Sequence, residues 1–151
     1  MGHDTFMREA LAEAAKARAK GEVPIGAVLV KDGEVIGSGH NLKETLQDPT
    51  AHAEIIAIRE AAGKIRSWRL DDADLYVTIE PCPMCMGAML QARVRRVIFG
   101  AFEPKAGAAG STVDLSVIRQ FNHRIEVIDG VLEDECRRLM QEFFQRRRKT
   151  E

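Results

Sequence analysis

The stretch IGAVLVKDGEVIGSGH, residues 25–40, decides the fold class because it opens the β structure of the chain with a hairpin. Residues 25–31 are apolar and β-branched, which is typical of a strand. Asp32-Gly33 follows, a pair strongly favoured in two-residue hairpin turns. Residues 34–40 then return as an antiparallel strand. Gly37 and Gly39 within it indicate a bulge or a close approach of another backbone.

Outward from this hairpin, helices and strands alternate along the chain. A first helix is expected from a cap at Asp4 or Thr5 to about Lys20, where Gly21 ends it. After the hairpin and a loop over 41–49, the expected elements are a helix over 51–62 capped by Thr50 and ended by Gly63, a strand over 75–79, a helix over 83–93, strands over 94–99 and 124–128, and a final helix over 133–148. This order predicts an α/β protein with a mixed sheet.

The composition is that of an ordinary globular protein and excludes several classes. The chain has 151 residues, 45% of them hydrophobic and 30% charged, which fits one domain over residues 1–151. No stretch approaches the roughly 18 apolar residues of a membrane-spanning helix, and no apolar signal-peptide core opens the chain. We therefore expect a cytoplasmic protein with no membrane partner. The net charge of −1 excludes a bulk nucleic-acid binder, so a polyanionic partner requires a local basic patch.

Two separate fragments carry residue types that bind metals. His52-Ala53-Glu54 lies at the start of one expected helix, and Pro81-Cys82-Pro83-Met84-Cys85 lies at the start of the next. Cys82 and Cys85 are three residues apart, so on a helix they share a face and can reach one ion. Each helix N-terminus points its partial positive charge toward that place, which favours thiolate over thiol. Two thiolates and an imidazole suit Zn²⁺.

The number of ligands indicates catalysis. A structural zinc is closed by four protein ligands, whereas a catalytic zinc keeps its fourth position for water. The third cysteine, Cys136, lies at apolar helical spacing and is interpreted as a core residue. An odd number of cysteines without a secretion signal also argues against disulfides. We therefore predict one catalytic Zn²⁺ per subunit, bound by His52, Cys82 and Cys85.

Glu54 is the predicted proton carrier. Zinc lowers the pKa of bound water from about 15.7 to about 7 and so supplies hydroxide at neutral pH. Hydrolysis of an amidine-like C–NH2 group also requires that a ring nitrogen be protonated and that ammonia leave. A carboxylate beside the water can carry a proton in both directions. Residues two apart fall on different faces of a helix, so this role requires His52 and Glu54 to lie in a first turn that wraps the metal.

Other interpretations of these fragments stay open at this point. A lone C-x-x-C also occurs in redox pairs and as half of a zinc ribbon. The absence of a second cysteine pair counts against a ribbon, and the flanking prolines and the separate H-x-E count against a redox pair. From another functional class, the alternative is a zinc-stabilised RNA-binding module without catalysis.

The combination of H-x-E with P-C-x-x-C thirty residues later resembles the signature of the zinc nucleobase deaminases. Nearly the whole chain is similar to the bacterial tRNA-specific adenosine deaminases of the cytidine/deoxycytidylate deaminase superfamily. The similarity rests on Pro24–Val28, Asn41, Asp48–Glu54, Thr78–Cys82, Gly87–Met89, Phe99–Ala101, Lys105, Gly107–Ser111, Asn122–Arg124 and Phe143-Phe144. The Gly107–Ser111 stretch and the aromatic-basic tail are the parts that indicate the tRNA branch.

The resemblance implies a three-layer α/β/α cytidine-deaminase-like fold with a five-stranded mixed sheet. It implies a homodimer in which each subunit helps to wall the other's site. The implied reaction is hydrolytic deamination of adenosine to inosine at the wobble position of a tRNA anticodon, by attack of zinc-bound hydroxide with Glu54 as the proton shuttle. Asn41 would hydrogen-bond the adenine, and Ala53 would contact the substrate. On its own account, Asn41 is also typical of a turn that closes a strand.

The tail provides candidates for holding an anticodon loop. Bases of single-stranded loops are readily swung out and held by aromatic or cationic side chains. Phe144 and Arg147 are predicted to contact the RNA, in a run that also contains Phe143, Arg146, Arg148 and Lys149. The alternative is a solvated helix end whose positive charges complement the helix dipole.

Two regions have no assigned role, and one alternative substrate class stays open. Arg93, Arg95 and Arg96 form a second basic cluster that faces either substrate or solvent. Phe102–Ala106 departs from the family, whose members more often carry short polar residues there with Thr before the glycine. The rival function is the same chemistry on a free nucleobase or nucleoside, of the guanine or cytosine type.

Overall fold

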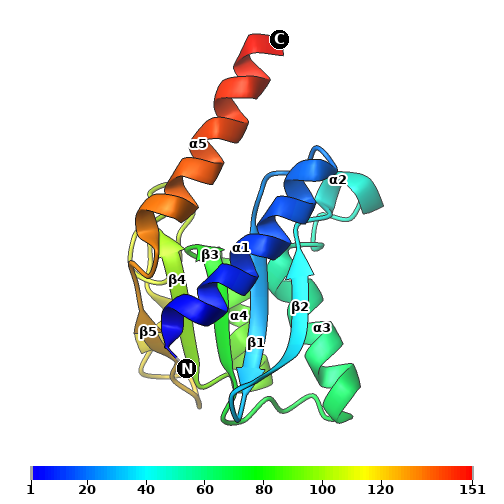
Figure 1. Ribbon diagram of the computed structural model, residues 1–151. Coiled ribbons are helices and arrows are strands. Elements are labelled where there is room, and N and C mark those ends of the chain that lie inside the picture. The colour runs from blue at the N-terminus through cyan, green and yellow to red at the C-terminus, as the bar shows by residue number, and fades with distance from the viewer. Residues whose placement is uncertain (1, 151) are drawn as a thin grey trace.

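A five-stranded mixed sheet forms the centre of the molecule, with helices on both faces (Figure 1). The computed structural model describes residues 2–150. The strands are β1 (Gly26–Lys31), β2 (Glu34–His40), β3 (Asp74–Ile79), β4 (Arg96–Ala101) and β5 (Glu126–Ile128), in the order β2-β1-β3-β4-β5. β1 is antiparallel to β2 and β3, whereas β3, β4 and β5 are parallel. The predicted α/β class and mixed sheet are confirmed.

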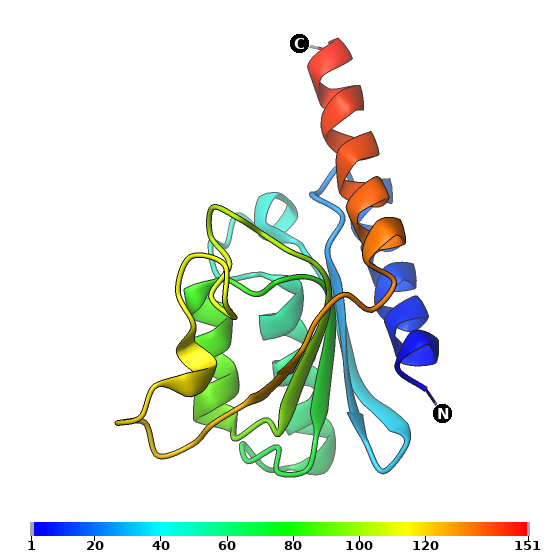
Figure 2. The same cartoon turned by 90° about the vertical axis from the view of Figure 1, so that its left-hand side faces the viewer.

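The helices form two outer layers (Figure 2). One face of the sheet carries α1 (His3–Ala19) and α5 (Glu133–Thr150), and the other carries α3 (Ala53–Ile65) and α4 (Pro83–Ala92). Strand side chains alternate between these two cores, as the period of two requires. In β1, Ala27 and Leu29 join the core beneath α3 and α4, whereas Val28 and Val30 join the core beneath α1. This is the predicted three-layer α/β/α arrangement.

The hairpin forms as its sequence predicts. Asp32 and Gly33 both have positive φ angles, of 52° and 74°, as a tight hairpin turn requires. Gly37 and Gly39 lie directly against α3, because a Cβ at either position would overlap backbone atoms of that helix. The register of β2 on β1 also shifts by one residue beside Gly37. Both predicted features, a bulge and a close backbone approach, are therefore present.

The predicted start and end of α3 were wrong. The N–H and the hydroxyl of Thr50 both donate to Asp48 Oδ1, at 2.9 and 2.7 Å, so Thr50 closes a turn and does not cap the helix. His52 takes the N-cap position, and the helix begins at Ala53. It continues through Gly63 to Ile65, whose side chain packs against the core, and Arg66 ends it with a positive φ.

Smaller differences occur at other ends. Asp4 and Thr5 lie inside the first turn of α1, which Gly2 precedes as N-cap, so neither caps the helix. β4 begins two residues later than predicted because the Val94 N–H still donates to Met89 O at the end of α4, at 3.1 Å. Two short elements interrupt expected loops, α2 (Lys43–Leu46) and η1 (Leu115–Val117). The C-terminal half of α5 projects beyond the body of the molecule (Figure 1). No helix among the described residues is both long and apolar enough to cross a membrane.

Candidate active site

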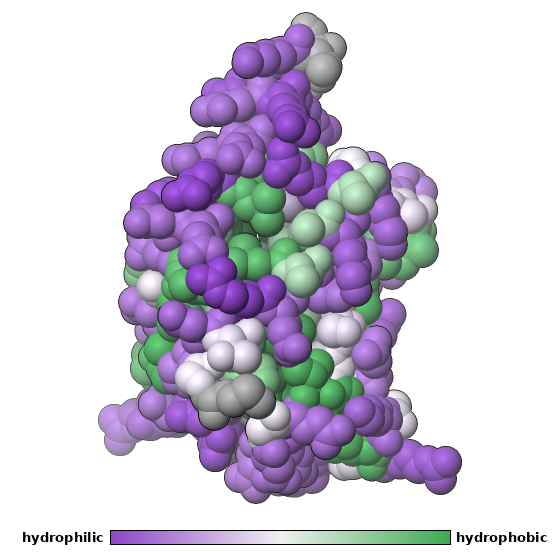
Figure 3. Space-filling view, in the orientation of Figure 1, coloured by the Kyte–Doolittle hydropathy of each residue, from purple (hydrophilic) through white to green (hydrophobic). Residues whose placement is uncertain are grey.

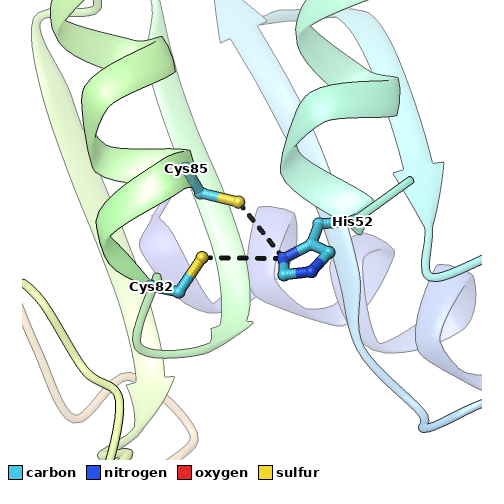
Figure 4. A group of neighbouring side chains, drawn as sticks. All are labelled: His52, Cys82 and Cys85. Atoms are coloured by element: carbon cyan, nitrogen blue, oxygen red, sulfur yellow. Dashed lines mark hydrogen bonds between the residues drawn. The ribbon is translucent and has the colours of Figure 1, made fainter. Parts of the chain in front are cut away.

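The N-termini of α3 and α4 meet just beyond the carboxyl end of β3. His52 and Cys82 are the N-cap residues of the two helices, and both have extended backbones. Neither side chain caps its own helix, so both are available to a ligand. Cys85 lies in the first turn of α4. Figure 4 shows the three side chains converging on one point between the helices.

The spacing of these three side chains fits zinc. His52 Nδ1 lies 3.6 Å from Cys82 Sγ and 3.5 Å from Cys85 Sγ. All three donor atoms lie within 4.8 Å of one another. Tetrahedral zinc with Zn–N near 2.0–2.1 Å and Zn–S near 2.3 Å separates N from S by about 3.6 Å. The donor set therefore matches Zn²⁺ in both chemistry and separation, and the structure brings the three predicted ligands together.

Hydrogen bonding redistributes protons among these donors. A hydrogen bond from Cys85 lowers the pKa of Cys82 to about 4, because it stabilises the thiolate. The same contact raises the pKa of Cys85. The hydrogen bond to Cys82 raises the pKa of His52. A thiolate is thus already favoured at Cys82, in the form that a metal requires.

Glu54 lies in the first turn of α3, two residues after His52. His52 precedes the helix while Glu54 belongs to it, so the two side chains can both face the metal cluster although they are only two residues apart. Its side chain is buried, with 4% exposure for the residue, beside the Cys82 and Cys85 side chains. Burial raises the pKa of Glu54 to about 7, because the charged form loses hydration. A carboxyl with such a pKa exchanges protons readily near neutral pH.

A cavity of about 280 Å³ opens directly onto this cluster. Cys82 lines it, together with four other predicted functional residues from the segments before α2 and at the start of α3: Asn41, His52, Ala53 and Glu54. Phe144 from α5 lines it as well. Arg147 does not. It lies in a separate cleft with Arg18 and Phe143, and its guanidinium stacks 6.0 Å from the centre of the Phe143 ring.

Known proteins resemble this chain over nearly its whole length. The model of the MafB19-like deaminase family matches residues 1–148. This chain belongs to that deaminase family. It is 53% identical over 146 residues to the tRNA-specific adenosine deaminase of Bacillus subtilis (strain 168), covering 97% of this chain and 91% of that protein. It is 50% identical to the Haemophilus influenzae tRNA-specific adenosine deaminase, covering 96% and 84%.

Solved structures agree with this assignment. One, from studies of A-to-I editing by tRNA:A34 deaminases at the wobble position of transfer RNA, superposes with a TM-score of 0.86 at 47% identity, covering 89% of this chain and 98% of that one. A guanine deaminase from Bacillus subtilis superposes with a TM-score of 0.64 at 37% identity, covering 78% and 86%. The predicted membership of this deaminase among the tRNA-specific adenosine deaminases is confirmed, as is its fold class.

The structure assigns Asn41 a turn and leaves part of its amide available. Its Oδ1 accepts from the Lys43 N–H at 3.1 Å, and its Nδ2 donates to Val23 O at 3.3 Å. The alternative interpretation of Asn41 as a turn residue is therefore borne out, and its predicted contact with adenine stays a prediction. An amide offers two N–H donors and two acceptor lone pairs, so one of each remains on this residue, which lines the cavity.

Cys136 of this deaminase is a core residue, as predicted. It is almost fully buried in the core beneath α1 and α5, on the face of the sheet away from α3 and α4. Burial raises the pKa of its thiol to about 12. Among the described residues, the group that could bind a metal consists of His52, Cys82 and Cys85 and does not include Cys136.

The second basic cluster lies far from the cavity. Arg95 and Arg96 both donate to the carboxylate of Asp74, at the amino end of β3. Arg93 donates to Leu90 O and closes the end of α4. The site follows the opposite, carboxyl end of β3. These arginines therefore stabilise the end of the sheet that lies opposite the site.

Two further buried carboxylates have structural roles that no sequence motif indicates, and one of them, Glu80, lines the cavity. Glu80 accepts hydrogen bonds from the loop after β4, at Glu103, Ala109 and Ser111. Glu22 accepts from the N–H groups of Glu44 and Thr45 at 3.1 and 2.6 Å, and so holds the first turn of α2. Their partners lie more than 20 residues away in sequence, so no local pattern indicates either role.

Proposed function

We propose that this deaminase converts adenosine to inosine at the wobble position of a tRNA anticodon by hydrolysis. The observation that carries the proposal is the position of Glu54. It is a buried carboxyl with a pKa near 7, beside a three-donor metal cluster that opens into a cavity of base size. The named relatives act on tRNA adenosine, which makes that the favoured substrate.

His52, Cys82 and Cys85 would hold one Zn²⁺. When bound, zinc supplies a water whose pKa is lowered to about 7 and which is therefore a nucleophile at neutral pH. Glu54 would take a proton from the attacking water and deliver it to the ring nitrogen beside C6 of adenine. It would then carry the proton of the newly formed C6 hydroxyl to the amine, which leaves as ammonia. The products are inosine and ammonia, so water, base and protons balance.

Asn41 and the cavity walls would orient the base. The free N–H and the free lone pair of the Asn41 amide form a donor–acceptor pair, and such a pair can read the edge of a purine. Ala53 lines the cavity and is completely buried, and its side chain is a single methyl group that leaves room for the base. A base held by Asn41 would be presented to the Glu54 carboxyl, which lines the same cavity.

The projecting half of α5 favours a polynucleotide over a free base. It carries Arg146, Arg147, Arg148 and Lys149 in succession, and Figure 3 shows this end of the molecule covered by hydrophilic side chains. The chain as a whole has a net charge of −1, so the positive charge of this run is a local patch and not a property of the whole surface. Phe144, 40% exposed, lies between the patch and the cavity and can stack on a nucleotide that enters it. We assign Phe144 and Arg147 to anticodon-loop binding.

A homodimer in the cytoplasm is part of the same proposal. Large apolar side chains are exposed in the segment between β4 and β5, at Val113, Val117 and Phe121. A partner subunit would cover them, and analytical ultracentrifugation measures this directly. The cytoplasm is the proposed location because the proposed tRNA substrate is present there.

Incubation of the zinc-loaded protein with bulk tRNA, followed by quantification of inosine, tests the function. Free adenosine, guanine and cytosine, assayed by ammonia release, form the second arm, since the superposed guanine deaminase makes a free-base substrate the second candidate. We expect inosine in tRNA and little ammonia from the free compounds. Ammonia from guanine with no inosine in tRNA would replace the proposal by the free-base function.

A truncation after Gln145 sharpens this test, because it removes the basic run while keeping Phe144 in the cavity wall. Loss of tRNA deamination with retained folding supports RNA binding by the tail. Its matched control is Arg137→Ala, earlier on the same helix, which removes an arginine that pairs with Glu133 and Asp134. Undiminished tRNA deamination by the truncated protein would rule out the tail as the RNA grip.

A further inference from the structure

The buried carboxylate of Glu80 has no part in the proposed proton transfers, yet it lies between β3 and the metal ligand Cys82. The residue is 3% exposed and borders the cavity. A buried charge of this kind is costly unless hydrogen bonds or ions compensate it. The groups that compensate the charge of Glu80 therefore indicate the role of this residue.

Backbone N–H groups of one loop provide the compensation. Glu80 Oε1 accepts from the Glu103 N–H at 3.1 Å and from the Ser111 hydroxyl. Glu80 Oε2 accepts from the Ala109 N–H at 3.1 Å and from the Ser111 N–H at 3.0 Å. A carboxylate offers about four acceptor sites, so the loop occupies all of them. Glu80 is therefore saturated and has no site left for substrate.

The loop is shaped around this carboxylate. Gly107 packs directly on it, because a Cβ there would overlap the Glu80 carboxyl group. The Gly107 N–H donates to Glu103 O, and the Ala108 N–H donates to Pro81 O, both at 2.8 Å. Residues 103–111 are thus wrapped around the side chain of Glu80 and tied to the strand end that also carries Cys82.

The same loop forms one wall of the cavity. Glu103 and Ala106 line it together with Asn41 and Phe144. The distance between the loop and Asn41 therefore sets how a nucleotide fits. A loop held only by its own ends would vary this distance, whereas four charge-assisted hydrogen bonds fix it.

We propose that Glu80 is a positioning residue: it fixes the loop over residues 103–111 as a preformed wall of the substrate cavity and thereby sets nucleotide binding. This inference rests on the proposed function for its substrate, but the anchor itself does not depend on catalysis. Preformed walls lower the cost of ordering on binding, so loosening this one weakens binding more than it slows chemistry.

Amide hydrogen exchange of the zinc-loaded protein tests the anchor. In Glu80→Ala, exchange at Ala109 and Ser111 should accelerate about tenfold or more, since their N–H groups lose a charged acceptor. Exchange in α1 and in β1 should stay at the wild-type rate. Glu80→Gln, which keeps one acceptor oxygen, should give a smaller effect. Unchanged exchange at residues 103–111 in Glu80→Ala overturns the proposal.

Gly107→Ala disrupts the contact between the loop and Glu80 from the loop side and leaves the Glu80 carboxylate in place. It should reproduce the local acceleration, because its methyl group displaces the loop from Glu80. Glu22→Gln is the matched control, since it weakens a buried carboxylate that holds α2 on another side of the cavity. Its faster exchange should be confined to residues 43–46. Acceleration over residues 103–111 in this control would overturn the assignment of the loop to Glu80.

Steady-state kinetics on an anticodon stem-loop RNA provide the functional readout. Glu80→Ala and Gly107→Ala should raise KM about tenfold while kcat changes less than about threefold, and Glu80→Gln should restore much of the KM. A general structural defect would instead lower the fraction of active, zinc-bound enzyme and hence kcat. Faster exchange with an unchanged KM overturns the role in binding. If wild-type protein forms no inosine, the proposed function fails while the exchange data still decide the anchor.

Discussion

The two ends of β3 place buried carboxyls in opposite environments. At the amino end, Asp74 is 6% exposed and receives four hydrogen bonds from Arg95 and Arg96. Burial alone would raise its pKa, but the hydrogen bonds from Arg96 and Arg95 hold the pKa of Asp74 below its ordinary value. Beyond the carboxyl end, Glu54 is equally buried beside thiols, and burial raises its pKa to about 7.

The difference shows that the partners, not burial, decide what a buried carboxyl can do. Asp74 stays ionised throughout the neutral range and links two strands, so it is structural. Glu54 is close to half-protonated near neutral pH, as a group must be if it both accepts and releases a proton. The sheet thus separates a stabilising ion-pair cluster at one end from the proposed chemistry at the other, and each end can be perturbed independently.

Removing a metal ligand should have the largest effect. Cys85→Ser replaces a thiolate by a hydroxyl that stays protonated, so zinc content should fall from about one per chain to near zero, and deamination should fall to background. Mass spectrometry of the metal and inosine formation measure the two effects. Cys136→Ser makes the same substitution in the other core and should retain zinc and activity. Full zinc occupancy in Cys85→Ser would refute the ligand assignment.

Glu54→Gln should come next, with a loss of about 10²–10⁴ in kcat, because the amide cannot carry a proton. Zinc content and the unfolding temperature should stay close to the wild-type values, which separates this loss from that caused by a missing ligand. Inosine formation under saturating RNA measures kcat. Activity within tenfold of wild type would remove Glu54 from the proton path and erase the contrast with Asp74.

At the other end, Asp74→Asn should reduce the free energy of unfolding by about 1–3 kcal/mol at pH 7 and leave kcat and zinc unchanged. Because the folded pKa is lowered, the stabilisation by Asp74 is fully present above its unfolded pKa near 3.9 and is lost as the pH falls below it. Urea unfolding of both proteins from pH 7 to pH 3 should therefore show their difference shrinking below about pH 4. A constant difference would contradict the ion-pair account.

How much of this could be predicted from sequence differs between the fold and the site. The hairpin and the alternating elements follow from local patterns, and these patterns persist in the folded chain. The start of α3 did not follow, because Asp48 competes for Thr50 and the outcome depends on the turn before the helix. α2 is only four residues long and gives no periodicity to detect.

Within the site, the metal cluster was predictable because each ligand lies in a short motif at a helix start. Ala53, Asn41 and Phe144 were indicated only by family resemblance, and Arg147 lies outside the cavity. The link between Glu80 and the loop over residues 103–111 gave no signal, since hydrogen bonds from backbone N–H groups to a distant carboxylate leave no trace in the residue types of the loop. Sequence patterns therefore indicated the groups proposed to react, but not Glu80, which we propose to hold the cavity wall beside them.

The smallest effect is expected from Asp71→Asn, three residues before Asp74 and at the same end of the sheet. Asp71 also pairs with an arginine, Arg69, at 3.0 Å, but both side chains are 52% exposed. Solvent already stabilises these charges, so the unfolding midpoint should stay within about 1 °C of wild type. Asp71→Asn and Asp74→Asn thus compare the loss of an exposed ion pair with the loss of a buried one. A shift as large as that of Asp74→Asn would mean that charge alone, and not desolvated hydrogen bonding, stabilises this end of β3.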